Sequence, residues 1–143
     1  AYGDPAANLS LISELIDALE SEQVWMAYQP KLDLRTNTVS GVEGLMRWNH
    51  PKRGFIAPDL FIGMAEETGQ IRALTEWGLR RVIADHETLA QAGHDIQMSV
   101  NISGRLLSDE AFAEFALHAA STAQGKLCFE ITETAVIDNP TVA

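Results

Sequence analysis

The sequence predicts an α/β fold built on a mainly parallel sheet. From residue 39 onward, strand-like segments alternate with helical ones: a strand at 39–48, helices at 58–69 and 71–92, a strand at 97–103, a helix from about 108, and a strand at 126–133. This alternation is typical of βαβ units. The 143 residues are 46% hydrophobic and 21% charged, which suits one globular domain with a buried core.

Local signals define the first half of the chain. An apolar stripe at helical spacing predicts an amphipathic lead-in helix within residues 1–23, with its buried face formed by Leu11, Ile12, Leu15, Ile16 and Leu19. The turn residues RTNT separate WMAYQPKLDL from VSGVEGLMRW and predict a hairpin of the first two strands. NHPKRGFIAP, residues 49–58, is predicted as a loop, and Pro58 and Gly69 mark the two ends of the next helix.

Two further helices are expected. The longer one begins near Ile71 and stops at Gly93. Ser108 is predicted as the N-cap of the second, whose buried face would comprise Phe112, Phe115, Ala116 and Ala119.

The composition argues against DNA binding, an internal disulfide and a membrane span. The 20 acidic and 10 basic residues give a net charge of −10, which argues against nonspecific binding to DNA. The single cysteine, Cys128, excludes an internal disulfide and suits a reducing compartment. No apolar run reaches the roughly 18–20 residues of a membrane span. We therefore expect a cytoplasmic chain, and the absence of an initiator methionine suggests a piece of a longer protein.

Each predicted strand has polar residues on one face. Strands covered on both sides of a parallel sheet should be almost wholly apolar, and these are not. In the strand at 97–103, the period of two puts Met98, Val100 and Ile102 on one face and Gln97, Ser99, Asn101 and Ser103 on the other. The corresponding faces of the other strands hold Glu43, Leu45 and Arg47 in the second strand, Cys128, Glu130 and Thr132 in the fourth, and Gln29 in the first. If the sheet curls toward a barrel, these residues converge at its C-terminal mouth, where barrel enzymes build active sites.

The chemistry of this face is rich in oxygen. Glu43, Asn101 and Glu130 offer hard oxygen ligands, which favour Mg²⁺, Mn²⁺ or Ca²⁺ over zinc or copper. Arg47 suits a phosphate, so metal and phosphate together indicate phosphoester hydrolysis. Structural alternatives stay open: a solvated Glu43–Arg47 pair, a turn role for Asn101, and a capping pattern from Glu130 to Glu133.

Five ordered blocks, AYQP, VEGLMRWNHP, PDLFIGMAEETG, SVNIS and FEITET, resemble the EAL domain of bacterial cyclic di-GMP phosphodiesterases. The resemblance covers the chain from about residue 24. It implies that residues 24–143 form the N-terminal half of a TIM-like (β/α)8 barrel whose first strand is antiparallel. The implied reaction is metal-assisted attack of water on one phosphodiester, giving linear pGpG, with Mg²⁺ or Mn²⁺ as cofactor and Ca²⁺ inhibitory.

The resemblance also implies residue roles. Glu43 would be the signature catalytic glutamate and a metal ligand, Asn101 and Glu130 the next two metal ligands, and Glu133 the residue that stabilises a loop over the metal. Substrate-binding roles fall on Gln29, Leu45 and Arg47.

Two features depart from the family pattern. Gly44 replaces the alanine of the signature, on the face opposite Glu43, where we expect little effect on chemistry. The family's later blocks are absent: paired aspartates, an active-site lysine, and a downstream glutamate and glutamine. A complete barrel takes about 250 residues, so we expect the 143-residue chain alone to be inactive.

Two other functions compete with the phosphodiesterase hypothesis. One is a catalytically silent EAL-like module that binds cyclic di-GMP or a partner protein. The other is a half-barrel that forms a homodimer through its open sheet edge. The resemblance further implies fused sensory or GGDEF-type domains in the parent protein, with no DNA partner and no membrane segment in this chain.

Overall fold

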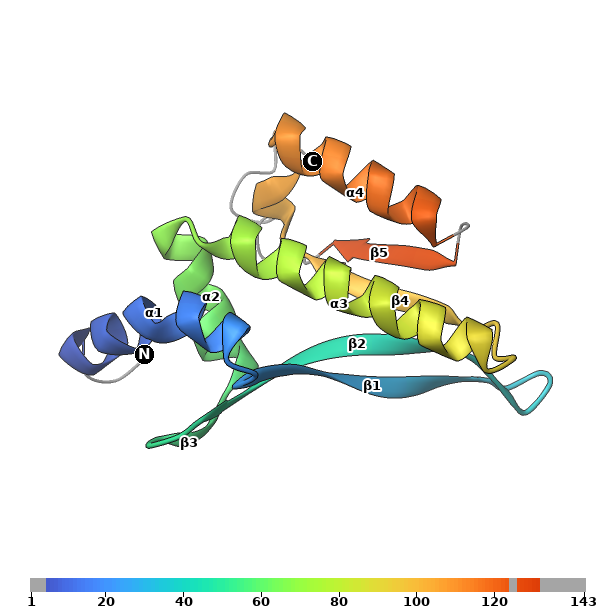
Figure 1. The fold of residues 1–143 in the computed structure, drawn as a ribbon, viewed down its shortest axis with the longest axis horizontal. Coiled ribbons are helices and arrows are strands. Elements are labelled where there is room, and N and C mark those ends of the chain that lie inside the picture. The colour runs from blue at the N-terminus through green and yellow to red at the C-terminus, as the bar shows by residue number, and fades with distance from the viewer. Residues whose placement is uncertain (1–4, 124–125, 132–143) are drawn as a thin grey trace.

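A computed structural model describes residues 5–123 and 126–131 as a mixed α/β fold (Figure 1). The elements are α1 (Pro5–Glu20), β1 (Val24–Asp33), β2 (Thr38–His50), β3 (Gly54–Ile56), α2 (Pro58–Thr68), α3 (Ile71–Gln91), β4 (Gln97–Ile102), the short 3-10 helix η1 (Gly104–Leu106), α4 (Glu110–Thr122) and β5 (Leu127–Ile131). Thr132, Glu133 and the final DNPTVA segment lie outside the described residues.

The sheet has the order β1-β2-β4-β5, with β3 also paired to β2. β1 and β2 form an antiparallel hairpin, and Asn37 takes a positive φ of 55° in its turn. β2 and β4 are parallel, as are β4 and β5. The predicted hairpin, the antiparallel first strand and the parallel neighbours are therefore confirmed. Over the described residues the sheet is open, with β1 at one edge and β5 at the other.

The loop predicted at residues 49–58 was wrong in part, because it contains β3. Gly54 to Ile56 return antiparallel along the end of β2, with Phe55 opposite Asn49. Gly54 has φ 75°, a left-handed conformation that glycine adopts at no steric cost. A strand of three residues is too short to show a period of two.

The core lies between the sheet and the helices. Figure 1 shows α3 and α4 over one face of the sheet, with no described helix over the opposite face. Trp48 of β2 is fully buried and meets Phe61 of α2 edge-on, with ring centroids 5.7 Å apart. Burying one such aromatic or leucine side chain stabilises the fold by roughly 1.5–3 kcal/mol. The packing of this layer leaves the polar faces of the strands on the side away from the helices.

The lead-in helix is part of this core. Leu11, Ile12 and Leu15 of α1 are buried as predicted, whereas Ile16 is 39% exposed. Glu14 accepts a hydrogen bond from His50 at 3.0 Å, which ties α1 to the end of β2 when the ring Nε2 carries the proton. α1 therefore packs directly against the strands that hold the candidate site.

Helix ends follow the sequence signals with one exception. Gly69 closes α2 in the left-handed conformation, with φ 79°. The N-cap of α4 is Asp109 and not Ser108, because the Asp109 carboxylate accepts the Phe112 backbone N–H at 3.0 Å. A cap must stand directly before the first helical residue to reach this donor. On the buried side of α4, Phe112, Ala116 and Ala119 are enclosed, while Phe115 is only partly buried.

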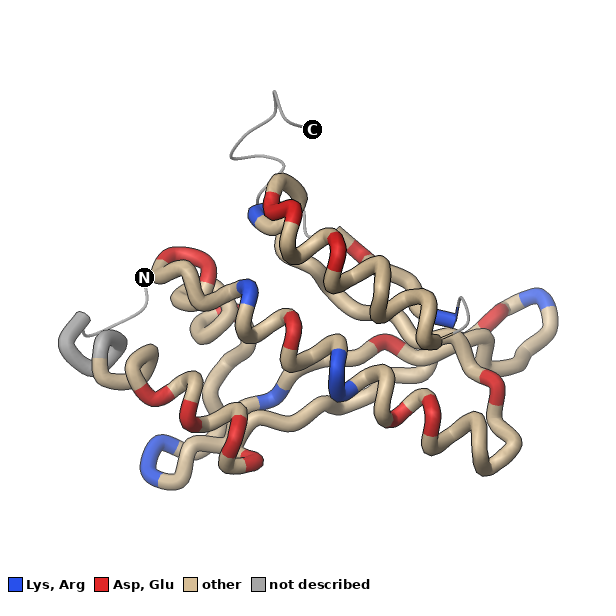
Figure 2. The backbone as a smooth tube through the Cα atoms, turned by 45° about the horizontal axis from the view of Figure 1, so that its top comes forward, with Lys and Arg blue, Asp and Glu red and all other residues tan. Residues whose placement is uncertain are grey.

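Acidic residues are spread along the helices, as Figure 2 shows, in keeping with the net charge of −10. Within the described ranges, none of the helices has the length and apolar character that crossing a membrane requires.

Candidate metal and phosphate site

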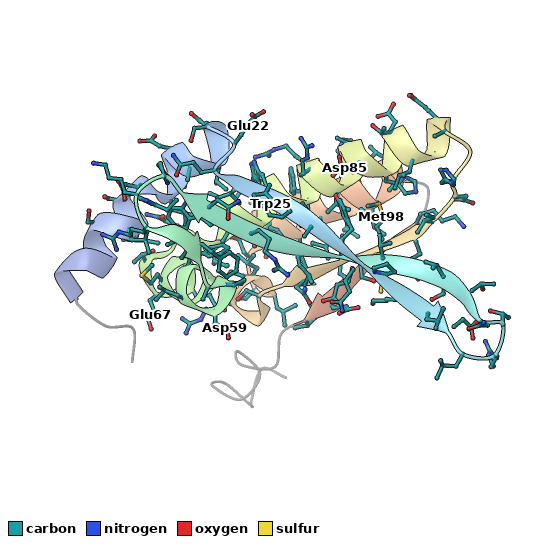
Figure 3. The ribbon with its side chains drawn as sticks, turned by 90° about the horizontal axis from the view of Figure 1, so that it is seen from below. Glu22, Trp25, Asp59, Glu67, Asp85 and Met98 are labelled. Carbon is teal, nitrogen blue, oxygen red and sulfur yellow. The ribbon has the colours of Figure 1, made fainter. Side chains whose placement is uncertain are left out.

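A row of side chains crosses the sheet on one face. The strand register places Gln29 opposite Glu43, Glu43 opposite Ser99, and Ser99 opposite Cys128. Two residues further along β4, Asn101 stands opposite Glu130. Because side chains on paired positions project to the same face, these six residues of the predicted polar set share one face of the sheet. Figure 3 views the molecule from the side where β1 and β2 lie in front of the helices.

This face is the one that the helices leave uncovered. A Cβ built on Gly44, the neighbour of Glu43, would meet Val82 of α3 at 3.4 Å and Met26 at 3.2 Å. Gly44 thus faces the helix layer, and Glu43 faces away from it. The departure from the signature alanine therefore falls on the packing side of β2.

Glu43 and Asn101 are in direct contact. The Asn101 amide nitrogen donates to Glu43 Oε2 at 3.1 Å, joining β2 to β4. Both side chains are only partly buried. A rotation of the amide by half a turn would bring its oxygen beside Glu43, which is the arrangement that a shared cation would require. Asn101 lies inside β4, so its alternative role as a turn residue was wrong.

Glu130 is held by a residue that the sequence reasoning did not select. Lys31 Nζ lies 2.5 Å from Glu130 Oε1 and 3.0 Å from Ser99 Oγ. The hydrogen bond with Glu130 raises the pKa of Lys31, and the negative charges of Glu130 and Glu43 add to this while desolvation opposes it. Lys31 is therefore a fully charged cation within the field of both carboxylates.

Lys31 reaches across the sheet from β1. It stands opposite Gly41 of β2, and its ammonium contacts Ser99 on β4 and Glu130 on β5. A Cβ at Gly41 would meet the Gln97 carbonyl oxygen at 2.7 Å, so this glycine lets β2 and β4 approach closely. The available signal was that Lys31 has the same parity as Gln29, but only its hydrogen bonds show how far it reaches.

Arg47 and Leu45 share the face of Glu43 by parity, further along β2. The Arg47 guanidinium donates to the Met46 carbonyl at 3.2 Å, and no ion pair joins it to Glu43 in the described structure. Residues four apart in a strand are about 13 Å apart, so the alternative of a Glu43–Arg47 pair was wrong. The guanidinium is therefore available for an anion on this face.

The end of β4 is anchored to α2. Ser103 donates to Glu66 Oε2 at 2.6 Å and accepts the Arg105 backbone N–H at 3.3 Å. Glu66 belongs to the PDLFIGMAEETG block, and only 14% of its side chain is exposed. This contact fixes the chain two residues after Asn101, and sequence reasoning missed it.

The donor set fits a hard divalent cation. Within residues 5–123 and 126–131 no group of three His, Cys, Asp or Glu side chains forms a metal centre, and the candidate set consists of two carboxylates and one amide. Oxygen ligands of this kind suit Mg²⁺ or Mn²⁺. Glu130 is already paired with the Lys31 ammonium on this face.

Residues 12–143 match the family profile of the EAL domain. The chain belongs to the EAL domain family. A curated relative, the cyclic di-GMP phosphodiesterase NbdA of Pseudomonas aeruginosa, is 38% identical over 135 residues, which cover 92% of this chain and 17% of NbdA. The bifunctional diguanylate cyclase/cyclic di-GMP phosphodiesterase MucR of the same organism is 33% identical over 130 residues, covering 88% of this chain and 19% of MucR.

A solved structure has the same fold. The PaMucR phosphodiesterase in complex with c-di-GMP superposes with a TM-score of 0.81 at 30% identity, covering 93% of this chain and 56% of that one. The chain thus spans about a fifth of the curated relatives' length and about half of the solved EAL chain.

Proposed function

We propose that this EAL chain supplies the first half of the active site of a metal-dependent phosphodiesterase that hydrolyses cyclic di-GMP to linear pGpG. The observation that supports this most is the Asn101–Glu43 contact at 3.1 Å, with Glu130 opposite Asn101 on the face free of helices. Asn101 and Glu130 are the penultimate residues of β4 and β5, and Glu43 lies near the end of the part of β2 that pairs with β4, Gly41–Gly44. Barrel enzymes place their sites toward these strand ends.

In this proposal Glu43, Asn101 and Glu130 hold a divalent ion, Mg²⁺ or Mn²⁺. When bound, the ion supplies an activated water and neutralises charge on the phosphate. Glu133 would hold a loop over the metal.

The substrate would be bound by residues on the same face. Arg47 would bind a phosphate through its planar fork, because within the described part of the chain its guanidinium donates to a backbone carbonyl and pairs with no carboxylate. Gln29, opposite Glu43, and Leu45 would line the cleft beside it.

The activity belongs, in this proposal, to a complete barrel. A (β/α)8 barrel takes about 250 residues, and this chain covers 56% of the solved EAL chain. The N-terminal half of a TIM-like barrel is therefore the proposed role of residues 24–143, within a cytoplasmic protein with sensory or GGDEF-type domains.

Metal choice tests the proposed function. In a complete EAL domain containing this chain, Mg²⁺ or Mn²⁺ should support hydrolysis of cyclic di-GMP, whereas Ca²⁺ should bind and support it poorly. Ca²⁺ accepts loose, higher coordination, while the reaction needs a tighter octahedral arrangement. The measurement is the rate of pGpG formation with each ion after removal of metal by EDTA. Equal turnover with all three ions would contradict the proposal.

A second candidate function is a module that binds cyclic di-GMP without hydrolysing it. The Lys31–Glu130 contact favours it, because the ammonium already neutralises one proposed metal ligand. Binding of cyclic di-GMP in EDTA, with no product on adding Mn²⁺, would identify this function.

A further inference from the structure

Lys31 occupies one of the two Glu130 oxygens that a metal could use. Its ammonium lies 2.5 Å from Glu130 Oε1, and its other hydrogen bond goes to Ser99 Oγ at 3.0 Å. Ser99 is in the same row as Glu43, so the ammonium sits between the two carboxylate-bearing strands. The negative charges of Glu130 and Glu43 both act on Lys31.

A divalent ion and this ammonium compete for the negative charge of Glu130. The lysine hydrogen bond takes one carboxylate oxygen, Oε1, and leaves Oε2 for a metal. Two cations held at contact distance from one carboxylate repel each other, and the repulsion is poorly screened at such a short separation. Metal binding therefore favours release of the ammonium.

The Lys31 side chain can move away from Glu130. About 38% of its side chain and 36% of that of Glu130 are exposed, and the lysine stem is flexible. The ammonium can therefore swing into solvent while β1 stays in its register with β2.

We propose that Lys31 is a tethered counter-cation that competes with the metal for Glu130 and thereby sets the metal affinity of the site. The inference rests on the proposed metal-binding role of Glu130. Without metal, Lys31 holds Glu130 in place and neutralises part of the negative charge on this face of the sheet. With metal, it is displaced, so the apparent affinity is reduced by the fraction of molecules in which Glu130 is free.

Lys31→Met tests this directly, since methionine retains length and removes the charge. A complete EAL domain containing this chain is titrated with Mn²⁺ alone, by isothermal calorimetry and by the EPR signal of free Mn²⁺. If the ammonium occupies Glu130 about nine-tenths of the time, the variant should bind Mn²⁺ about tenfold more tightly. Its melting temperature should be lower than wild type without metal and should rise further on adding Mn²⁺.

Lys126→Met is the matched control. Lys126 pairs with Asp95 at 3.5 Å and shows similar side-chain exposure, so its removal changes the net charge equally without touching the site. Its Mn²⁺ affinity should stay within about twofold of wild type because exposed charges at a distance are screened. Lys31→Gln provides a second neutral variant, with folding of each checked by circular dichroism.

The outcomes separate the two proposals. Tighter Mn²⁺ binding by the Lys31 variants and not by Lys126→Met supports the competition. Unchanged or weaker binding by the Lys31 variants would overturn it while leaving the metal site intact. No Mn²⁺ binding by any of these complete domains would overturn the metal-binding role of Glu130, and this inference with it.

Discussion

Glu43→Gln is expected to abolish hydrolysis of cyclic di-GMP by a complete EAL domain containing this chain, lowering kcat by at least about 10²–10³-fold. Removing one charged group that stabilises a developing charge has effects of this size. Glutamine retains the shape of the side chain, and its amide oxygen can still accept the bond from Asn101 that measures 3.1 Å here. The fold should therefore survive while the site loses a negative charge.

Arg47→Ala is the matched comparison for Glu43→Gln, because it changes a proposed phosphate contact in place of a proposed metal ligand. It removes a proposed phosphate contact and leaves Glu43, Asn101 and Glu130 untouched, so KM should rise while Mn²⁺ binding stays the same. Product formation and Mn²⁺ titration of both variants provide the test. A Glu43→Gln enzyme with near-normal kcat, or an Arg47→Ala enzyme that loses only kcat, would contradict the assigned roles.

Residues 1–143 alone are expected to show no phosphodiesterase activity. They provide three proposed metal ligands and none of the family's later catalytic groups, and Lys31, near the metal position, is already bonded to Glu130. Adding the C-terminal half of an EAL domain, in cis or in trans, should restore turnover. The assay is pGpG formation by the purified chain with and without that second half.

The physical state of the isolated chain should reflect its open sheet. β5 is an edge strand, and no described helix covers the face that bears Glu43 and Glu130. Such an edge invites pairing with a second copy, so light scattering should report a dimer or larger species. Metal-dependent turnover by a monomeric 143-residue chain would contradict both expectations.

Strand parity explains what the sequence could predict about the site. The alternation in β4 placed Ser99 and Asn101 on one face and Val100 on the other, because side-chain direction in a strand is a local property. The same argument placed Glu43 and Glu130, and the register then brought Asn101 opposite Glu130. The face of the sheet on which each side chain lies was therefore predictable from the sequence of its own strand.

The distances between these side chains and their hydrogen-bond partners were not predictable from the pattern of single strands. Lys31 reaches Ser99 and Glu130 from β1, and its place in the sheet is set by the register of the whole hairpin. The contact between Ser103 and Glu66 joins segments 37 residues apart and has no local signal. The short strand β3 and the exact start of α4 were also not predicted from the sequence. β3 is too short to show a period of two, and Asp109 and Ser108 are both good N-cap residues.

The most direct test of the central claim is anomalous diffraction from Mn²⁺-soaked crystals of a complete EAL domain containing this chain. We expect a manganese peak about 2.0–2.6 Å from oxygens of Glu43, Asn101 and Glu130, on the face of the sheet away from α3. A peak on the helix-covered face, or one bound without these three residues, would contradict it.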